Sequence, residues 1–574
     1  MIRVLEFLIL SVVLIASSCN RDEVITTDFP PEIEVAADGG IYQVKVGHEL
    51  LISLNVENSE GAQYLWRTSR GEEWTTPSAE LRYTSNEIGT VYITLTVTSP
   101  NGSDSEELRV DILDLERPVI KIINNPATIA VGTSLRIEAQ VSQCSIPTTV
   151  EWLVDEQKVQ DGGTSYHFEG VELGEYTITA RAKNDDGEAE SSFIVTVISA
   201  EDMPLCWEFE SLEIHTVVGR KLRIRPTEYS KDVSYCWTSD NGTGSSPEFI
   251  YTPTYEGAHI VRGTISTIRG GESLSITHEF IVRAYNEDAY LRPATATSIA
   301  ECSAVVGYTP APGQFINDTK TSGFDGSELT TEAAIAYAER RLTEGKFVSL
   351  GAFGGEIIVA FDHSIVEGEG YDFAIVGNSF DSSSEPGVVW VMQDENGNGE
   401  ADDTWYELVG SESGLASTIA DYEVTYFRPA GDAMSVLWRD NLGNTGEIDY
   451  LQQFHPQDSY YPAWITEDSY TLRGTRLEAR NYDKSGNGSM WIQPPYDWGY
   501  ADNYSSIDLL DANATGYGEG KPNGFDIANA IDCEGKPIKL SHIDFVKVQC
   551  AVQAKSGWVG ELSTEVLGIY DCRL

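Results

Sequence analysis

The feature that most constrains the fold is a repeat of roughly 85 residues that occurs three times between Pro30 and Tyr285. Each copy has a Val-Gly step, a strand of alternating apolar and polar residues, a strand with a tryptophan, and two further alternating strands. The tryptophans are Trp66, Trp152 and Trp237. Alternation with a period of two between turn residues is typical of β-sandwiches, in which such a tryptophan fills the core. We therefore predict three small sandwiches in series.

A chain of 574 residues is too long for one hydrophobic core. After the repeats, one convincing helix, residues 330–342, stands among short strands and long loops rich in Gly, Asn, Asp and Tyr. The predicted fold class is all-β: three Ig-like sandwiches, then a larger jelly-roll-like β-sandwich with long loops and one short helix. The predicted segments are a leader (1–18), a lipidated linker (19–29), three sandwiches (30–114, 115–200 and 201–286) and a C-terminal ligand-binding domain (287–574).

The net charge excludes one class of partner. Lys and Arg number 38 against 90 Asp and Glu, which gives a formal net charge of −52. So acidic a chain repels nucleic acids and anionic lipid surfaces. We therefore expect no nucleic-acid partner, and we expect any membrane attachment to depend on an anchor.

The first residues predict export and lipid attachment. An apolar run, residues 4–16, is too short to span a bilayer as a helix. The Ala-Ser-Ser-Cys step that ends at Cys19 resembles the lipobox of bacterial lipoproteins, with an ordinary cleaved signal peptide as the alternative. The acidic residues just after Cys19 resemble the surface-export signal of some Gram-negative lipoproteins. We expect a protein held in the outer membrane by lipid at Cys19 and facing the cell exterior.

One loop has the composition of a cation site. An apolar run that ends at Met392 leads into DENGNGEADD, residues 394–403, and a second short strand follows. A hard cation such as Ca²⁺ takes about six to eight oxygen ligands, and glycines permit the tight loop that brings them together. The flanking strands exclude an EF-hand, and a polar hairpin turn without metal is the alternative. The predicted ligands of a structural Ca²⁺ are Asp394, Asn396, Asn398, Glu400, Asp402 and Asp403.

A second stretch, YDKSGNGSMWIQPPYDWGYADNY at residues 482–504, is rich in aromatic residues among glycines and prolines. Exposed aromatic side chains in such loops offer rigid contact area for a large planar or ring-shaped ligand. The alternative is that the tryptophans pack beneath the loop as a small core. The predicted ligand-binding residues are Trp491, Tyr496, Trp498, Tyr500 and Tyr504.

The repeats resemble PKD-like domains in their layout and in endings such as IGTVYITLTVTSPNG and LGEYTITARAKNDDG. The part from about Ala300 to Leu574 resembles the C-terminal domain of a family of bacterial surface lipoproteins. The resemblance rests on VSLGAFGGEIIVAFDHSI, GYDFAIVGNSFD, DENGNGEADDTWYELVGSE, WGYADNY and FDIANAIDCEGKPIKLSHIDFVKVQ. Members of this family include the cobalamin-binding BtuH-type lipoproteins.

This resemblance implies binding without turnover. The implied ligand is cobalamin or a related corrinoid, captured for an outer-membrane transporter of the TonB-dependent class. The PKD-like units would then act as spacers. A glycan-binding or adhesin role is the alternative, because aromatic loops also suit sugar stacking.

No catalytic residue is predicted. The sequence contains no GxSxG and no HExxH motif. A carboxylate pair such as Glu385 with Asp394 would permit a surface glycan hydrolase, but distance along the sequence does not place two carboxylates at a working separation. We therefore expect a binding protein rather than an enzyme.

Overall fold

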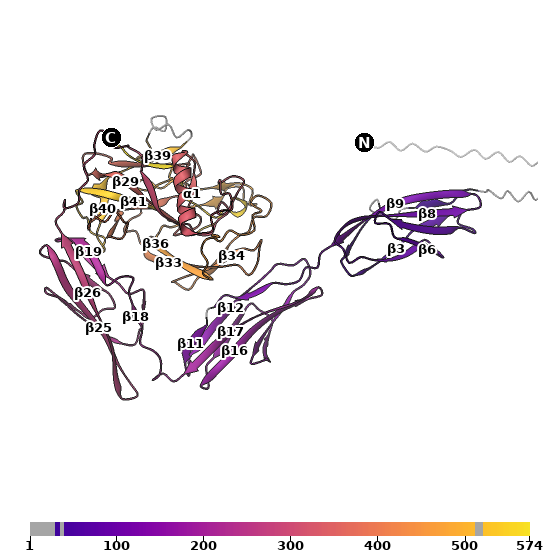
Figure 1. Ribbon diagram of the computed structural model, residues 1–574, viewed down its shortest axis with the longest axis horizontal. Coiled ribbons are helices and arrows are strands. Elements are labelled where there is room, and N and C mark those ends of the chain that lie inside the picture. The colour runs from indigo at the N-terminus through magenta and orange to yellow at the C-terminus, as the bar shows by residue number, and fades with distance from the viewer. Residues whose placement is uncertain (1–28, 35–39, 125, 511–519) are drawn as a thin grey trace, which may run out of the picture. The chain divides into compact units, whose positions relative to one another are not determined.

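The computed structural model describes residues 29–34, 40–124, 126–510 and 520–574. The predicted leader and Cys19 lie outside the described residues. Contacts divide the chain into two compact units, residues 1–116 and 117–574. The fold is nearly all-β, with one α-helix among the described elements, as predicted (Figure 1). No helix in the described part of the chain is long and apolar enough to cross a bilayer.

The first unit is a β-sandwich around Trp66. This side chain is fully buried, and its indole Nε1 donates a hydrogen bond to Thr76 Oγ1 at 2.9 Å. A five-stranded sheet has the order β2-β9-β8-β5-β6, and the pairs β3–β7 and β1–β4 complete the sandwich. The strands are β1 (Glu32–Glu34), β2 (Ile41–Lys45), β3 (Glu49–Ser53), β4 (Asn55–Glu57), β5 (Gln63–Thr68), β6 (Glu73–Thr76), β7 (Glu80–Thr84), β8 (Gly89–Ser99) and β9 (Gly102–Leu113).

The second sandwich repeats this plan around the buried Trp152. Its sheets have the orders β11-β17-β16-β13-β14 and β10-β12-β15. The strands are β10 (Ile120–Ile122), β11 (Ala127–Ala130), β12 (Ser134–Val141), β13 (Thr149–Val154), β14 (Gln157–Asp161), β15 (Ser165–Glu169), β16 (Gly174–Asn184) and β17 (Gly187–Ile198).

The third sandwich has two buried tryptophans, Trp207 and Trp237, whose rings meet edge to face at 5.0 Å. Its main sheet has the order β19-β26-β25-β22-β23. The strands are β18 (Trp207–Glu208), β19 (Glu213–Val217), β20 (Leu222–Ile224), β21 (Glu228–Tyr229), β22 (Ser234–Thr238), β23 (Thr243–Gly244), β24 (Phe249–Tyr251), β25 (Gly257–Arg269) and β26 (Glu272–Tyr285).

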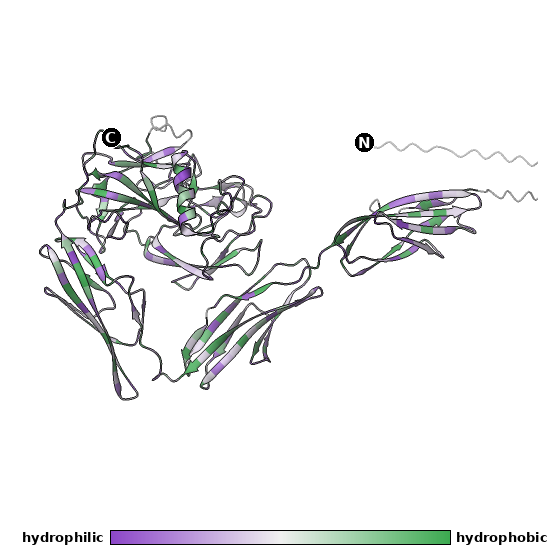
Figure 2. Cartoon of the chain, in the orientation of Figure 1, coloured by the Kyte–Doolittle hydropathy of each residue, from purple (hydrophilic) through white to green (hydrophobic). Residues whose placement is uncertain are grey.

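The repeated Val-Gly step has a structural reason. In each sandwich an early strand pairs in parallel with the last strand, and the chain then turns sharply into the opposite sheet. Gly47, Gly132 and Gly219 make this turn with φ of 78°, 84° and 84°, a conformation that favours glycine. Hydrophobic and hydrophilic residues alternate along many of the strands (Figure 2), so one face of each sheet is buried.

The C-terminal part contains a six-stranded sheet of order β27-β29-β41-β31-β32-β40 and a three-stranded sheet of order β39-β30-β43, which share one hydrophobic core with the helix. The elements are β27 (Ala304–Thr309), α1 (Thr331–Thr343), β28 (Val348–Ser349), β29 (Glu356–Val366), β30 (Phe373–Gly377), β31 (Gly387–Met392), β32 (Trp405–Leu408), β39 (Lys521–Phe525), β40 (Ala530–Ile531), β41 (His542–Cys550), β42 (Glu565–Val566) and β43 (Gly568–Asp571).

A further four-stranded sheet, β35-β34-β33-β36, has its own core. Its strands, and those of a small hairpin that follows, are β33 (Ile419–Phe427), β34 (Val436–Asp440), β35 (Thr445–Ile448), β36 (Ser469–Arg476), β37 (Tyr482–Asp483) and β38 (Trp491–Ile492). Helix α1 begins where it was predicted: the Thr330 side chain accepts a hydrogen bond from the Ala333 N–H at 3.3 Å. It ends at Thr343, two residues before Gly345, which has φ 62°.

Candidate functional site

The oxygen-rich loop 394–403 joins β31 to β32 and is organised by Asp394. The backbone N–H groups of Asn398 and Gly399 donate to the two carboxylate oxygens of Asp394, each at 3.0 Å. Gly397 and Gly399 have φ of 73° and 80°, which this tight turn requires. The Asp394 N–H donates to Asp544 Oδ2 at 2.8 Å, so the start of the loop is tied to the central strand β41.

Four of the six predicted metal ligands contact one another through hydrogen bonds between amide nitrogens and carboxylates. Asn396 Nδ2 lies 3.3 Å from Asp402 Oδ1 and 3.2 Å from Asp403 Oδ1, and Asn398 Nδ2 lies 3.1 Å from Asp402 Oδ2. Glu400 differs, because it is exposed and contributes its backbone N–H to Asn398 Oδ1 at 2.7 Å, and no contact of its carboxylate is described. These contacts define a polar cluster of Asn396, Asn398, Asp402 and Asp403 beside Asp394, which we call the loop cluster, and it does not include the Glu400 side chain. Among the described residues, the carboxylates of Asp394, Asp402 and Asp403 do not form a group whose oxygens all lie within 4.8 Å of one another.

The carboxylates of this loop repel one another. Burial, followed by Asp402 and Asp394, raises the pKa of Asp403 to about 7, and burial also raises the pKa of Asp394. A carboxyl whose pKa is raised in the folded state makes folding less favourable as pH rises above its ordinary value. A cation among these oxygens would relieve that repulsion, and oxygen is the ligand atom that Ca²⁺ prefers.

A calcium ion in this loop predicts a pH-dependent stabilisation. Calcium should raise the melting temperature of the full chain in calorimetry, more at pH 8 than at pH 5.5, because protons compete for Asp403. Asp402→Asn should reduce this shift. Glu400→Gln, which leaves the loop cluster intact, should not reduce it. A calcium-dependent shift that is the same in wild type and Asp402→Asn would contradict the site.

The loop rests on the third sandwich and the segment after it. Arg220, which is 5% exposed, donates from Nη1 to Glu395 Oε1 at 3.1 Å and from Nη2 to Glu287 at 2.5 Å. Glu395 follows Asp394 directly, and its N–H donates to Asp403 Oδ2 at 2.7 Å. The third sandwich therefore contributes a buried cation beside the loop cluster.

The predicted aromatic segment is mostly a packing element. Tyr496 and Tyr500 are each 2% exposed, and their rings meet edge to face at 5.6 Å within a small core. The Tyr496 hydroxyl donates to Glu478 O at 2.5 Å, and the Tyr500 hydroxyl accepts from the Glu412 N–H at 3.0 Å. The expectation that these two rings face a ligand is therefore wrong: they bury their apolar surface beneath the loop and direct their hydroxyls to backbone partners.

The remaining three aromatic residues of the segment are half-buried and do not form one surface. Trp491 packs closely on Gly557, where a Cβ would lie 2.7 Å from the indole Nε1. Trp498 lines a separate hollow of about 140 Å³. The Tyr504 N–H donates to Ser384 Oγ at 3.0 Å, and no ring contact joins Tyr504 to either tryptophan among the described residues.

An exposed aromatic pair lies next to Trp491 and was not singled out from the sequence. Trp558 is 51% exposed and Phe454 is 49% exposed, with ring centroids 5.9 Å apart. Trp558 belongs to a short turn, Gly557–Val559, which Asn481 fixes by donating to Lys555 O and to Ser556 Oγ, each at 2.9 Å. The sequence signal was a tryptophan between Gly557 and Gly560, but the partner ring is about a hundred residues away along the chain.

Two hollows of the C-terminal part bear on the size of ligand that it could enclose. The hollow beside Trp498 is lined by Tyr371, Ile507 and Phe525, among others. Another, of about 450 Å³, lies at the end of α1 and is lined by Cys302, Glu339 and Glu344, among others. Neither of these two hollows would enclose a large macrocyclic ligand, whereas the open surface of Trp558 and Phe454 would admit one.

Comparison with known protein families supports the prediction that the repeats are PKD-like domains. Residues 30–99 match the PKD-like domain, so the chain carries PKD/Ig-like sandwiches. No curated protein matches the chain.

Several solved structures of Ig-like and fibronectin-like modules resemble parts of the chain. The fibronectin(III)-like modules of Clostridium thermocellum CbhA share 16% identity and cover 30% of this chain and 97% of their own, with a TM-score of 0.19. The titin I-band fragment I67–I69 shares 13% identity and covers 45% of this chain and 98% of its own, with a TM-score of 0.20. The three N-terminal domains of the bacteriophage RB49 Hoc protein share 10% identity and cover 42% and 95%, with a TM-score of 0.22. Structural similarity at these TM-scores supports no conclusion about function.

Proposed function

We propose that this protein is a surface-exposed outer-membrane lipoprotein, anchored through Cys19, whose C-terminal part captures cobalamin or a related corrinoid. The protein would deliver the ligand to an outer-membrane transporter of the TonB-dependent class, without chemical turnover. The PKD-like sandwiches would act as spacers between the lipid and the binding part. The resemblance of the C-terminal part to cobalamin-binding BtuH-type lipoproteins is the origin of this proposal.

The single observation that carries the proposal is the exposed pair Trp558 and Phe454. Large aromatic side chains are usually buried in a folded domain, and two exposed rings in contact form an apolar surface with polar edges. A corrin is a large, rigid and partly apolar ring with amide arms. Two aromatic rings at 5.9 Å suit one face of such a ligand, and Trp491, under the same turn, stiffens the surface.

A glycan ligand is the second candidate, and the same pair favours it. Sugar rings also stack on exposed tryptophan, and the acidic, calcium-binding character proposed for loop 394–403 is compatible with a surface lectin. The two ligands differ in light absorption, because a corrinoid absorbs strongly in the visible range and a glycan does not.

Gel filtration with visible detection tests the proposal. The full chain is mixed with cyanocobalamin and separated, and the absorbance of the corrin is followed together with that of the protein. We expect the corrin absorbance to elute with the protein. Elution of all the corrin at the position of the free ligand would overturn the corrinoid assignment.

A further inference from the structure

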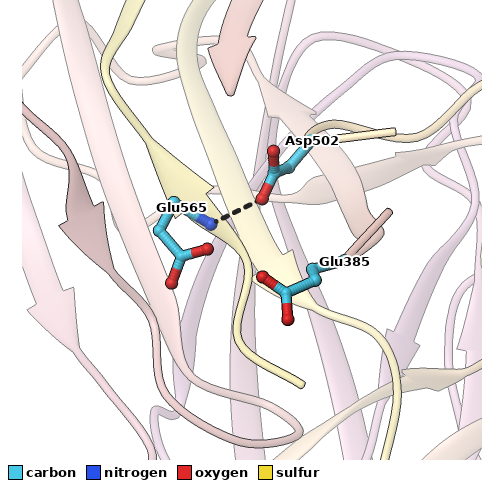
Figure 3. A group of neighbouring side chains, drawn as sticks. All are labelled: Glu385, Asp502 and Glu565. Atoms are coloured by element: carbon cyan, nitrogen blue, oxygen red, sulfur yellow. Dashed lines mark hydrogen bonds between the residues drawn. The ribbon is translucent and has the colours of Figure 1, made fainter. Parts of the chain in front are cut away.

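Three carboxylates from distant parts of the chain meet inside the C-terminal part. Glu385 precedes β31, Asp502 lies in the loop after β38, and Glu565 begins β42. One oxygen of each lies within 4.8 Å of an oxygen of both others, and no ion is present there. Figure 3 shows the carboxylates of Glu385 and Glu565 pointing toward one another, with Asp502 beside them.

Asp502 is held rigidly in this group. Its Oδ1 accepts hydrogen bonds from the backbone N–H groups of Asn378 and Ser379, both at 2.8 Å, and its Oδ2 accepts from the Glu565 N–H at 3.0 Å. Its backbone has φ 50°, which few non-glycine residues adopt. The chain therefore fixes this carboxylate in place, although the residue is fully buried.

The other two carboxylates have few partners. Glu565 is 2% exposed, and its buried Oε1 accepts no hydrogen bond among the described residues. Glu385 Oε1 accepts one from Gln493 Nε2 at 3.3 Å. The buried Oγ of Ser379, next to Asp502, also has no partner in the described part of the chain. A buried polar atom without a partner is unfavourable, so these unfilled acceptors indicate a missing group.

No basic side chain in the described part of the chain forms an ion pair with this group. Three other buried carboxylates in the C-terminal part have an arginine: Asp372 has Arg573, Asp544 has Arg292, and Glu412 has Arg480. None of Glu385, Asp502 and Glu565 forms such an ion pair among the described residues. Burial, followed by Asp502, raises the pKa of Glu385 to about 8, and burial raises the pKa of Asp502 to about 7. Either protons or a bound cation must balance the charge.

We propose that Glu385, Asp502 and Glu565 bind a divalent hard cation, with Ca²⁺ as the first candidate, at a site separate from loop 394–403. Carboxylate oxygens lie about 2.3–2.6 Å from Ca²⁺, so two ligands of one ion lie at most roughly 5 Å apart, as these oxygens do. An all-oxygen donor set disfavours the softer metals that prefer sulfur and imidazole. The ion would tie the loop that carries Trp498 and Tyr504 to β42 and to the start of β31.

Calcium stoichiometry in matched variants tests this site. The full chain is dialysed against roughly 0.1 mM Ca²⁺, within the range in which extracellular calcium modules bind, and bound calcium is measured by atomic emission. The test variant is Glu565→Gln. The control is Glu561→Gln, because Glu561 is equally buried, also has an unpartnered oxygen, and lies outside the group of three. We expect Glu565→Gln to bind one calcium ion fewer than wild type and Glu561→Gln to bind the same number.

Equal stoichiometry in wild type and a folded Glu565→Gln would overturn the proposal. If Glu565→Gln does not fold, the calcium stoichiometry of Asp402→Asn tests the proposal instead, since this substitution disturbs only loop 394–403. Two calcium ions in wild type and one in Asp402→Asn would support the buried site, whereas one in wild type and none in Asp402→Asn would overturn it in favour of shared protons. No arm of this test uses cobalamin, so its outcome is independent of the proposed function.

Discussion

Replacing Arg220 with alanine is expected to destabilise the C-terminal part by about 3 kcal/mol, because breaking a buried ion pair leaves its partners uncompensated. Arg220 is almost fully buried between Glu287 and Glu395. Burial raises the pKa of Glu395 well above its usual range even with Arg220 present. Burial would also raise the pKa of Glu287, but Arg220 and a hydrogen bond from Ser541 outweigh burial and lower it. The ion pair is therefore chiefly with Glu287.

Differential scanning calorimetry of the full chain measures this effect. We expect the transition of the C-terminal part to shift down by roughly 5–10 °C at pH 7. Since the folded pKa of Glu287 is lowered, the stability from this pair is present above its ordinary pKa of 4.5 and is lost as pH falls through the folded value. The difference between wild type and Arg220→Ala should therefore shrink at acidic pH.

Arg223→Ala is the matched control. Arg223 also reaches from the third sandwich to the C-terminal part, where Nη1 donates to Asp421 Oδ2 at 3.0 Å, but it is partly exposed and Arg225 binds the same carboxylate. Its loss should change stability by less than about 1 kcal/mol. Equal shifts for Arg220→Ala and Arg223→Ala would contradict the special role of Arg220.

Trp558→Ala is expected to weaken cobalamin binding by about 1–3 kcal/mol, roughly 5- to 150-fold, because an aromatic side chain at the centre of a contact often carries much of its free energy. Trp558 is half-exposed and contacts Phe454, so its removal leaves most of the fold untouched. The dissociation constant is measured by titration calorimetry on the full chain.

Phe380→Ala is the control for this substitution, since Phe380 is 60% exposed on the same part of the chain and has no aromatic partner among the described residues. It should leave the dissociation constant unchanged. Trp498→Ala discriminates further, because Trp498 lines a different hollow. If Trp498→Ala lost affinity for cobalamin and Trp558→Ala did not, the ligand site would lie at the hollow lined by Trp498 rather than on the surface of Trp558 and Phe454.

The sandwiches and the helix could be predicted because their signals are local. Alternation along strands, a tryptophan in each repeat and the Thr330 cap lie within a few residues of the features that they determine. The polar contacts within loop 394–403 are local in the same way, since Asn396, Asn398, Asp402 and Asp403 lie within ten residues, but the calcium ion in this loop stays a prediction. Glu400 was the exception, because composition does not show which way a side chain in a turn points.

Contacts between distant segments could not be predicted. Tyr496 and Tyr500 have the composition of a binding loop, but only tertiary packing decides that their rings are buried. Phe454 and Trp558 lie about a hundred residues apart, and Glu385 meets Asp502 and Glu565 rather than Asp394. Neither pairing leaves a periodic signal in the sequence.

The structure also changes where a binding fragment should begin. A fragment that starts at Ala300 would lose Glu287 and Arg220, and it would lose Arg292, whose Nη2 donates to Asp544 Oδ1 at 2.9 Å. Residues 201–574 retain all three, together with the whole third sandwich. Residues 201–574 are therefore the right fragment in which to measure the affinity of the C-terminal part for its ligand without the first two sandwiches.

Titration calorimetry with cyanocobalamin on residues 201–574 and on the full chain tests the central claim most directly. The account predicts that both bind cobalamin with the same dissociation constant, because the first two sandwiches add reach and not affinity. A full chain that binds while residues 201–574 remain folded and do not bind would contradict it, as would the absence of cobalamin binding in both proteins together with binding of a glycan.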